Sequence, residues 1–151
     1  MIVYLMRHGK AAQSSPDGPR ELTEKGRAEV AHVAEHFKKK GLKVTQAWHS
    51  SKTRAIQTCD VFLKTTGFQD VPVEEHKQLR PEGDTDEIYE EIKKLKEGPL
   101  LIVSHMPFVA GLAATLVDGT EISFPTAGLA AFERKGKDWK FLWSWDPANL
   151  K

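Results

Sequence analysis

The chain has 151 residues, the length of one ordinary domain with its own core, and we expect residues 1–151 to form a single domain. Its 22 basic and 21 acidic residues leave a net charge of +1, which excludes the strong field that recruits nucleic acid or an anionic membrane. A lone cysteine excludes an internal disulfide, and the five-residue apolar run before Arg7 is too short for a signal peptide or spanning helix, so we expect a cytoplasmic protein.

Apolar runs alternate with helical periodicity along most of the chain. Thr23 is a predicted N-cap, Pro72 restricts its strand to a sheet edge, and Pro107 is predicted at the first helical position. In chain order we expect a strand at 2–6, a helix at 24–40, a strand at 44–48, a helix at 52–66, an edge strand at 71–73, a helix at 85–96, a strand at 100–104, a helix at 107–117, and a hairpin of strands at 128–134 and 139–145.

Two side-chain patterns belong to these elements. Ile56, Cys59 and Leu63 lie on one predicted helix face, and alternating tryptophans in the last strand predict one face that is core or rim. The alternation of strands and helices indicates an α/β fold, with a mostly parallel sheet and an antiparallel element near the C-terminus.

Several cation-capable side chains follow the ends of predicted strands. Arg7 and His8 follow the first strand, His105 follows strand 100–104, and Arg54 begins the helix after strand 44–48. Because ligands of open α/β sheets bind at the carboxyl ends of the strands, we expect these four side chains to meet at one rim.

This set of side chains favours phosphate chemistry. Arginine presents a fork of donors that matches phosphate oxygens, and a helix N-terminus also attracts an anion. A neutral histidine nitrogen can attack phosphorus and form a covalent phosphoenzyme, while a second, protonated histidine donates to an oxygen. No metal is required when these groups carry the charge. Taken singly, Arg54 is typical of a solvated helix residue and His105 of a helix cap, so the prediction rests on their joint placement.

Four segments, in order along the chain, resemble the signatures of the histidine phosphatase superfamily, with its phosphoglycerate-mutase-like fold. They are "LMRHGKA", "LTEKG", "HSSKTRAIQT" and "LIVSHMPFV". The short span before "LTEKG", the "LRPEGD" stretch and the overall length are similar to the small SixA-type phosphohistidine phosphatases. The resemblance implies a three-layer α/β/α sandwich with one antiparallel strand.

The resemblance also implies roles for individual residues. His8 would be the transiently phosphorylated nucleophile, Arg7, Arg54 and His105 would complete the phosphate pocket, and Ser50 would add a hydroxyl. One departure from the usual pattern is Lys52-Thr53, which replaces Pro-Leu after the serine pair and brings a positive charge to the site.

The identity of a general acid is left open by the sequence. Glu82 and Asp84 in the "RPEGD" loop are the nearest candidates, with Asp84 alternatively a cap of the following helix. His32 and His36 have a spacing that suits a metal, but they lack a third ligand, so we expect a helix-surface pair and no metal.

Three functions remain from the sequence. The first is a phosphatase acting on phosphohistidine of a protein or peptide, since imidazole is a good leaving group that makes little demand on an acid. The second is a phosphatase of a small phosphomonoester, and the third is a non-catalytic phosphate-binding module, disfavoured because both histidines and both arginines are present. The expected partner is a phosphorylated protein or a small phosphorylated substrate, without a cofactor, nucleic acid or membrane. The absence of long insertions predicts an open, shallow site.

Overall fold

The computed structural model describes residues 1–13 and 19–150, so residues 14–18 and Lys151 lie outside the described part of the predicted domain. The elements are β1 (Ile2–Arg7), α1 (Glu24–Lys39), β2 (Gln46–His49), α2 (Thr53–Thr66), β3 (Val73–Glu75), η1 (Lys77–Leu79), α3 (Thr85–Lys94), β4 (Leu100–Ser104), α4 (Phe108–Leu116), β5 (Leu129–Lys135), β6 (Asp138–Trp145) and η2 (Pro147–Asn149).

The strands form one sheet in the order β3-β2-β4-β1-β5-β6. β3, β2, β4 and β1 are parallel, whereas β5 is antiparallel to both of its neighbours. The predicted mixed sheet with one antiparallel strand is therefore confirmed. In the β1–β4 ladder Arg7 is the partner of Ser104, so the carboxyl ends of these two central strands are level.

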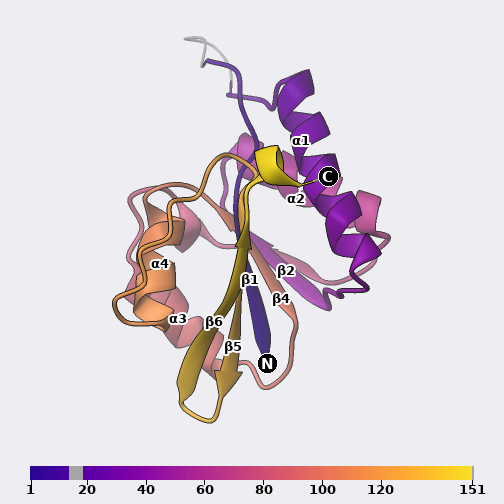
Figure 1. Ribbon diagram of the computed structural model, residues 1–151. Coiled ribbons are helices and arrows are strands. Elements are labelled where there is room, and N and C mark those ends of the chain that lie inside the picture. Colours follow the sequence, from indigo (N-terminus) through magenta and orange to yellow (C-terminus); the bar gives the residue numbers. More distant parts are fainter. Residues whose placement is uncertain (14–18, 151) are drawn as a thin grey trace.

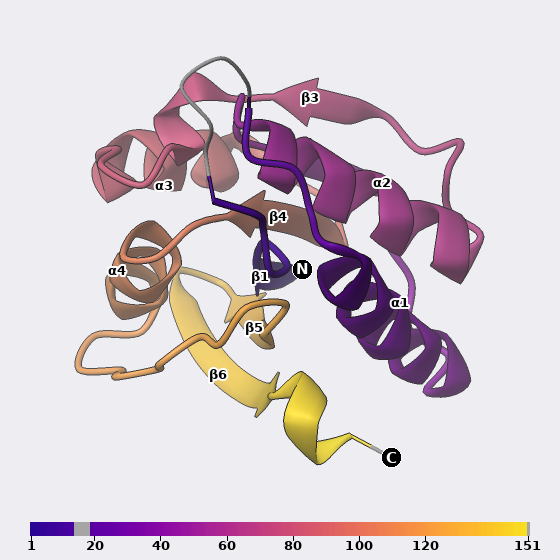
Figure 2. The same cartoon turned by 90° about the horizontal axis from the view of Figure 1, so that it is seen from above.

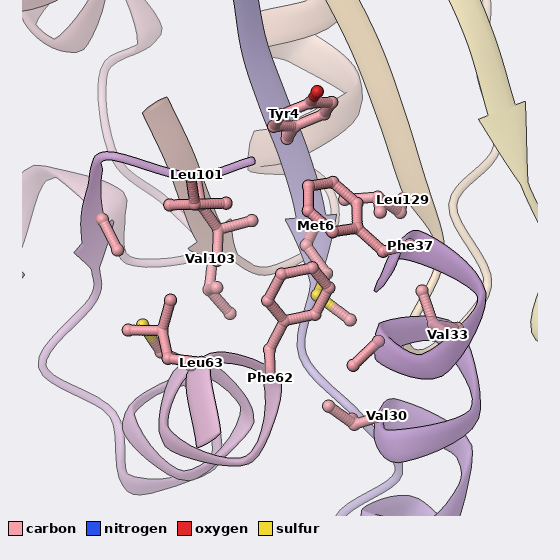
Figure 3. Close-up of a cluster of buried hydrophobic side chains, with 14 of the residues drawn as sticks. Tyr4, Met6, Val30, Val33, Phe37, Phe62, Leu63, Leu101, Val103 and Leu129 are labelled. Atoms are coloured by element: carbon pink, nitrogen blue, oxygen red, sulfur yellow. The ribbon is translucent and has the colours of Figure 1, made fainter. Parts of the chain in front are cut away.

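The helices cover both faces of the sheet, α1 and α2 on one side and α3 and α4 on the other (Figures 1 and 2). Successive side chains of β1 point to opposite faces of the sheet. Tyr4 and Met6 therefore belong to the core under α1 and α2, while Val3 and Leu5 belong to the core on the opposite face. Figure 3 shows Tyr4 and Met6 among the side chains of the first core. The implied three-layer α/β/α sandwich is thus confirmed.

Local chemistry explains where the helices begin and end. The Thr23 hydroxyl accepts a hydrogen bond from the Gly26 N–H at 2.9 Å, which confirms the predicted cap of α1. α2 ends at Gly67, whose φ of +85° lies in the left-handed region that glycine adopts without strain. The Asp84 carboxylate accepts from the Asp86 N–H at 2.9 Å and caps α3.

Some predicted boundaries and one predicted face are wrong. α4 begins at Phe108, and Pro107 is its N-cap rather than its first helical residue. The strand at 71–73 is displaced to Val73–Glu75, so Pro72 lies just before the edge strand. Ile56 is 37% exposed, because α2 turns Ala55, Cys59 and the residues one turn further along toward the sheet.

The predicted tryptophan face is divided between the two layers. Trp143 and Trp145 stack at 3.9 Å between ring centroids and pack against the α1–α2 core, whereas Trp139 packs against the other core. The register changes between Ala131, which pairs with Trp143, and Phe132, which pairs with Phe141. The extra residue in β6 is a β-bulge, which reverses the alternation of faces.

Candidate active site

The site lies at the carboxyl edge of the central strands. β4 separates β1 from β2, and the helix that follows β1 in the chain, α1, covers one face of the sheet whereas the helix that follows β4, α4, covers the other (Figure 2). Helices that diverge to opposite faces leave a crevice between two adjacent strands, which is where open α/β sheets bind ligands. His8 and His105 follow these two strands, with ring centroids 5.0 Å apart.

His8 is held by its backbone and by its ring. Its N–H donates to Ser104 O at 2.9 Å, and its carbonyl accepts from the Ala127 N–H at 3.0 Å. Ring atom Nδ1 lies 2.6 Å from Gly9 O. Because a carbonyl oxygen only accepts, Nδ1 carries the proton, and Nε2 of the neutral ring keeps its lone pair.

The surroundings of His8 favour this neutral form. The residue is only 6% exposed. Burial lowers the pKa of His8 to about 4, and the positive charges of Arg54, Arg7 and Arg20 act in the same direction, against the raising effect of the Gly9 carbonyl. At neutral pH Nε2 is therefore an unprotonated nitrogen surrounded by cations.

Arg54 extends from the first turn of α2 to the Nε2 side of that ring. Its Nε donates to His8 Nε2 at 3.3 Å, which agrees with a proton on Nδ1. Burial also lowers the pKa of Arg54. A guanidinium nevertheless keeps its charge in proteins. An anion bound at His8 Nε2 would therefore meet the Arg54 guanidinium, whose Nε–H is already directed at that atom.

His105 and Ser50 form the second half of the crevice. The Ser50 hydroxyl is fully buried and lies 2.6 Å from His105 Nε2, and it accepts from the Lys52 N–H at 3.2 Å. Burial, followed by the effect of His8, lowers the pKa of His105 to about 3. His105 is therefore neutral in the free site. The sequence had suggested a second histidine that is protonated and donates to a phosphate oxygen.

Two buried nitrogens of the site have no hydrogen-bond partner within the described part of the chain: Arg7 Nε and His105 Nδ1. Arg7 uses Nη1 to donate to Phe124 O at 3.0 Å, which fixes the guanidinium beside the end of β1. Buried polar atoms in native proteins are nearly always paired, so these nitrogens indicate a site built for a polar ligand. The Arg7 Nε–H requires an acceptor, and so does His105 Nδ1 in the tautomer in which Nε2 accepts from the Ser50 hydroxyl.

Two further cations contribute to the electrostatics. Lys52, which replaces the usual proline, lowers the pKa of His105, as the sequence comparison suggested for an added charge. Arg20 lowers the pKa values of His8, Arg54 and His105, and its side chain donates to Ala12 O at 3.0 Å. Sequence reasoning missed Arg20, because it follows no strand and no motif marks it.

The two candidate acids have other contacts. Asp84 is the N-cap of α3, which confirms the alternative prediction that it caps this helix. The Glu82 carboxylate lies 3.3 Å from Arg80 Nε and is 69% exposed. Neither carboxylate has a recorded bond to the histidines or arginines of the crevice.

The histidine pair of α1 lies apart from the crevice. His32 Nε2 is 2.9 Å from Leu150 O, and His36 packs edge-on against Trp145 with centroids 4.6 Å apart. Over residues 1–13 and 19–150, no three His, Cys, Asp or Glu side chains are grouped in a way that would hold a metal ion. In the same part of the chain, no helix has the length and apolar character needed to cross a membrane.

A three-layer α/β/α sandwich that brings two histidines and two arginines together at the carboxyl edge of its sheet is typical of enzymes that handle phosphoryl groups. The model of the histidine phosphatase superfamily (branch 1) matches residues 3–95 of this chain. The chain therefore belongs to the histidine phosphatase superfamily and is a phosphatase. A search of curated proteins by sequence found no match.

Solved structures are similar over nearly the whole chain. The protein histidine phosphatase SixA, solved in complex with tungstate, is 28% identical with a TM-score of 0.94, and the match covers 100% of both chains. A protein of Agrobacterium tumefaciens assigned as the phosphohistidine phosphatase SixA is 22% identical, with a TM-score of 0.83 over 97% of each chain. The α-ribazole phosphatase of Shigella flexneri is 14% identical, with a TM-score of 0.76 over 94% of this chain and 95% of its own. The last two likenesses concern the fold alone.

Proposed function

We propose that this chain hydrolyses phosphohistidine on a protein or peptide through a covalent intermediate at His8. The lone pair of His8 Nε2 attacks phosphorus, the N–P bond to the substrate imidazole breaks, and that imidazole leaves with a proton from solvent. Water then attacks the phosphorus, and the His8–phosphorus bond breaks. Orthophosphate is released, and His8 returns to its starting form.

The observation that carries this proposal is the state of His8. Its Nδ1 is hydrogen-bonded to Gly9 O and its pKa is lowered to about 4, so Nε2 is unprotonated at neutral pH and becomes a nucleophile once the substrate phosphoryl group displaces its hydrogen bond from Arg54 Nε. Arg54 Nε is directed at the same atom, the His105 ring lies 5.0 Å from the His8 ring, and both Arg7 and His105 retain a buried nitrogen without a partner in the described part of the chain. These groups would bind the transferring phosphoryl oxygens without a metal. The Ser50 hydroxyl would support them through His105.

In residues 1–13 and 19–150, neither candidate acid is bonded to the crevice, which favours an imidazole leaving group. An alkoxide departs slowly unless an acid protonates it, whereas imidazole is weakly basic and departs readily. Asp84 caps a helix and Glu82 is exposed beside Arg80, so neither is held where such an acid would act. The similarity to the solved structure of SixA, a protein histidine phosphatase, also supports phosphohistidine as the substrate.

An open groove beside the site supports a macromolecular substrate. The groove has a volume of about 650 Å³ and runs along α4 from Met106, next to His105, to Ser123, next to the Phe124 carbonyl that holds Arg7. A side chain presented by another protein would enter the crevice while its flanking residues lie in this groove. A small phosphomonoester would leave it unused.

A substrate panel tests the proposal. Phosphohistidine peptide, phosphoserine peptide and a sugar phosphate are compared by kcat/KM in the wild type and in Glu82→Gln and Asp84→Asn. We expect phosphohistidine to be the best substrate, with both variants close to wild type on it. If a sugar phosphate is the better substrate and Glu82→Gln abolishes its hydrolysis, the protein is a small-molecule phosphatase. If no substrate turns over and phosphate still binds, it is a binding module.

A further inference from the structure

Four hydrogen bonds form a closed circuit that includes both His8 and Arg54. His8 Nδ1–H donates to Gly9 O at 2.6 Å, and the Gly9 N–H donates to Thr58 Oγ1 at 2.9 Å. The Thr58 hydroxyl donates to Arg54 O at 2.7 Å, and Arg54 Nε donates to His8 Nε2 at 3.3 Å. The side chain that joins the strand end to the helix in this circuit is Thr58, which is fully buried.

A threonine inside a helix often donates to the carbonyl four residues earlier, and that bond alone has no functional meaning. Thr66 in the same helix provides the comparison, because its hydroxyl donates to Phe62 O at 2.9 Å and has no recorded bond outside α2. Thr58 differs because its oxygen also accepts from Gly9, which is 49 residues away in the sequence. This acceptor role connects α2 to the residue that orients His8.

Packing gives Gly9 little freedom to move toward α1. A Cβ at Gly9 would lie 2.8 Å from Val30 Cγ2 and 3.1 Å from Gly26 O. The strand end is therefore pressed against α1 on one side and bonded to α2 through Thr58 on the other. Without the Thr58 hydroxyl, the buried Gly9 N–H would lose its acceptor and the turn after His8 would be held from one side only.

We propose that Thr58 is a positioning residue for phosphoryl transfer, which fixes the His8 ring and the Arg54 guanidinium relative to each other. It acts through Gly9 O, which keeps the proton of His8 on Nδ1, and through the Arg54 backbone. This role rests on the proposed function. It predicts that the hydroxyl matters for the rate and for the tautomer of His8, and not only for folding.

The test compares Thr58→Val, Thr58→Ser and the matched control Thr66→Val. Valine keeps the volume of threonine and removes the hydroxyl, whereas serine keeps the hydroxyl. We expect Thr58→Val to lower kcat/KM for phosphohistidine peptide by about 10²-fold, the loss typical of a displaced catalytic group, mainly through kcat. Thr58→Ser should recover most of the rate, and Thr66→Val, which also loses a buried hydroxyl in α2, should keep the wild-type rate.

A second measurement does not depend on activity. Nitrogen-15 NMR of the imidazole rings reports which nitrogen of His8 carries the proton. We expect the Nδ1–H form in the wild type, in Thr58→Ser and in Thr66→Val, and a mixture of both tautomers in Thr58→Val. An unchanged His8 tautomer in folded Thr58→Val would overturn the inference, as would equal losses of rate in Thr58→Val and Thr66→Val. If the wild type has no phosphatase activity but the tautomer changes as expected, the proposed function fails while the positioning by Thr58 stands.

Discussion

Arg54 directs a donor at the proposed nucleophilic atom, with Nε 3.3 Å from His8 Nε2. Removing a preorganised donor for developing charge costs about 10²–10³-fold in rate, and we expect that loss for Arg54→Ala measured as kcat. Arg54→Lys should recover only part of it, because an ammonium lacks the planar fork. We expect losses of similar size for Arg7→Ala and His105→Ala. Wild-type kcat in Arg54→Ala would remove this residue from the site.

The pKa of His8 links the chemistry of the site to the stability of the fold. The ordinary histidine value near 6.5 applies to the unfolded chain, whereas burial lowers the folded value to about 4. Between these values the unfolded chain binds more protons, so the free energy of unfolding falls as the pH drops from about 6.5 to about 4. His105, lowered to about 3, adds a loss of the same sign that extends to lower pH.

We expect an NMR titration of His8 to have its midpoint near pH 4, so that the ring is almost entirely neutral at pH 6 and above. We also expect His8→Asn to reduce the dependence of the unfolding free energy on pH between about 4 and 6.5, measured by urea denaturation, and to leave the part that His105 contributes. A midpoint for His8 near 6.5, or a slope unchanged by His8→Asn, would mean that the ring is not held neutral by its burial.

Among the elements, the start of α1 depends on close contact with the segment after His8. A Cβ on Gly26 would lie 2.1 Å from Lys10 O, a distance that the backbone cannot tolerate. We expect Gly26→Ala to lower the free energy of unfolding by about 1–3 kcal/mol, as overpacked sites do, and to lower kcat because Lys10 adjoins Gly9.

Gly111→Ala in α4 is the matched control for this substitution. Its Cβ would meet Thr85 Cγ2 at 3.3 Å, and alanine gains about 1 kcal/mol of helix propensity over glycine. We therefore expect little or no loss of stability in urea denaturation. Equal losses from the two substitutions would contradict a specific contact between α1 and the strand end.

Strong local signals allowed most elements to be predicted. The continuous apolar runs at β1 and β4, and the Thr23 cap of α1, have a single simple interpretation. The exposure of Ile56 and the bulge in β6 were not predictable, because they depend on how α2 rotates against the sheet and on an unpaired residue in a ladder. Both are consequences of tertiary packing.

The same division applies to the site. His8, Arg7 and His105 were found because each follows a strand whose apolar run is obvious, and parallel strands bring their ends together. Thr58 and Arg20 were not found. The role of Thr58 depends on a contact across 49 residues, and Arg20 acts through its charge alone. The substitution of Lys52 for proline was visible in the sequence, and its charge does reach His105.

We expect an oxyanion to stabilise the folded protein and a chelator to leave its stability and activity unchanged. A ligand that binds only the folded chain stabilises it by about 2.7 kcal/mol at one hundred times its Kd. We expect vanadate to raise Tm in a concentration-dependent way in the wild type and much less in Arg54→Ala. EDTA should leave both Tm and activity unchanged. Activity that is abolished by EDTA and restored by a divalent ion would overturn the metal-free mechanism.

The covalent intermediate at His8 is the central claim, and a rapid-quench experiment with phosphorus-labelled phosphohistidine peptide tests it most directly. Within one turnover we expect labelled phosphate on the protein that is stable to base and labile to acid, as a nitrogen–phosphorus bond is. Peptide mapping should place it on His8, and His8→Asn should trap none and lose turnover. Label on another residue, or full turnover by His8→Asn, would contradict the mechanism.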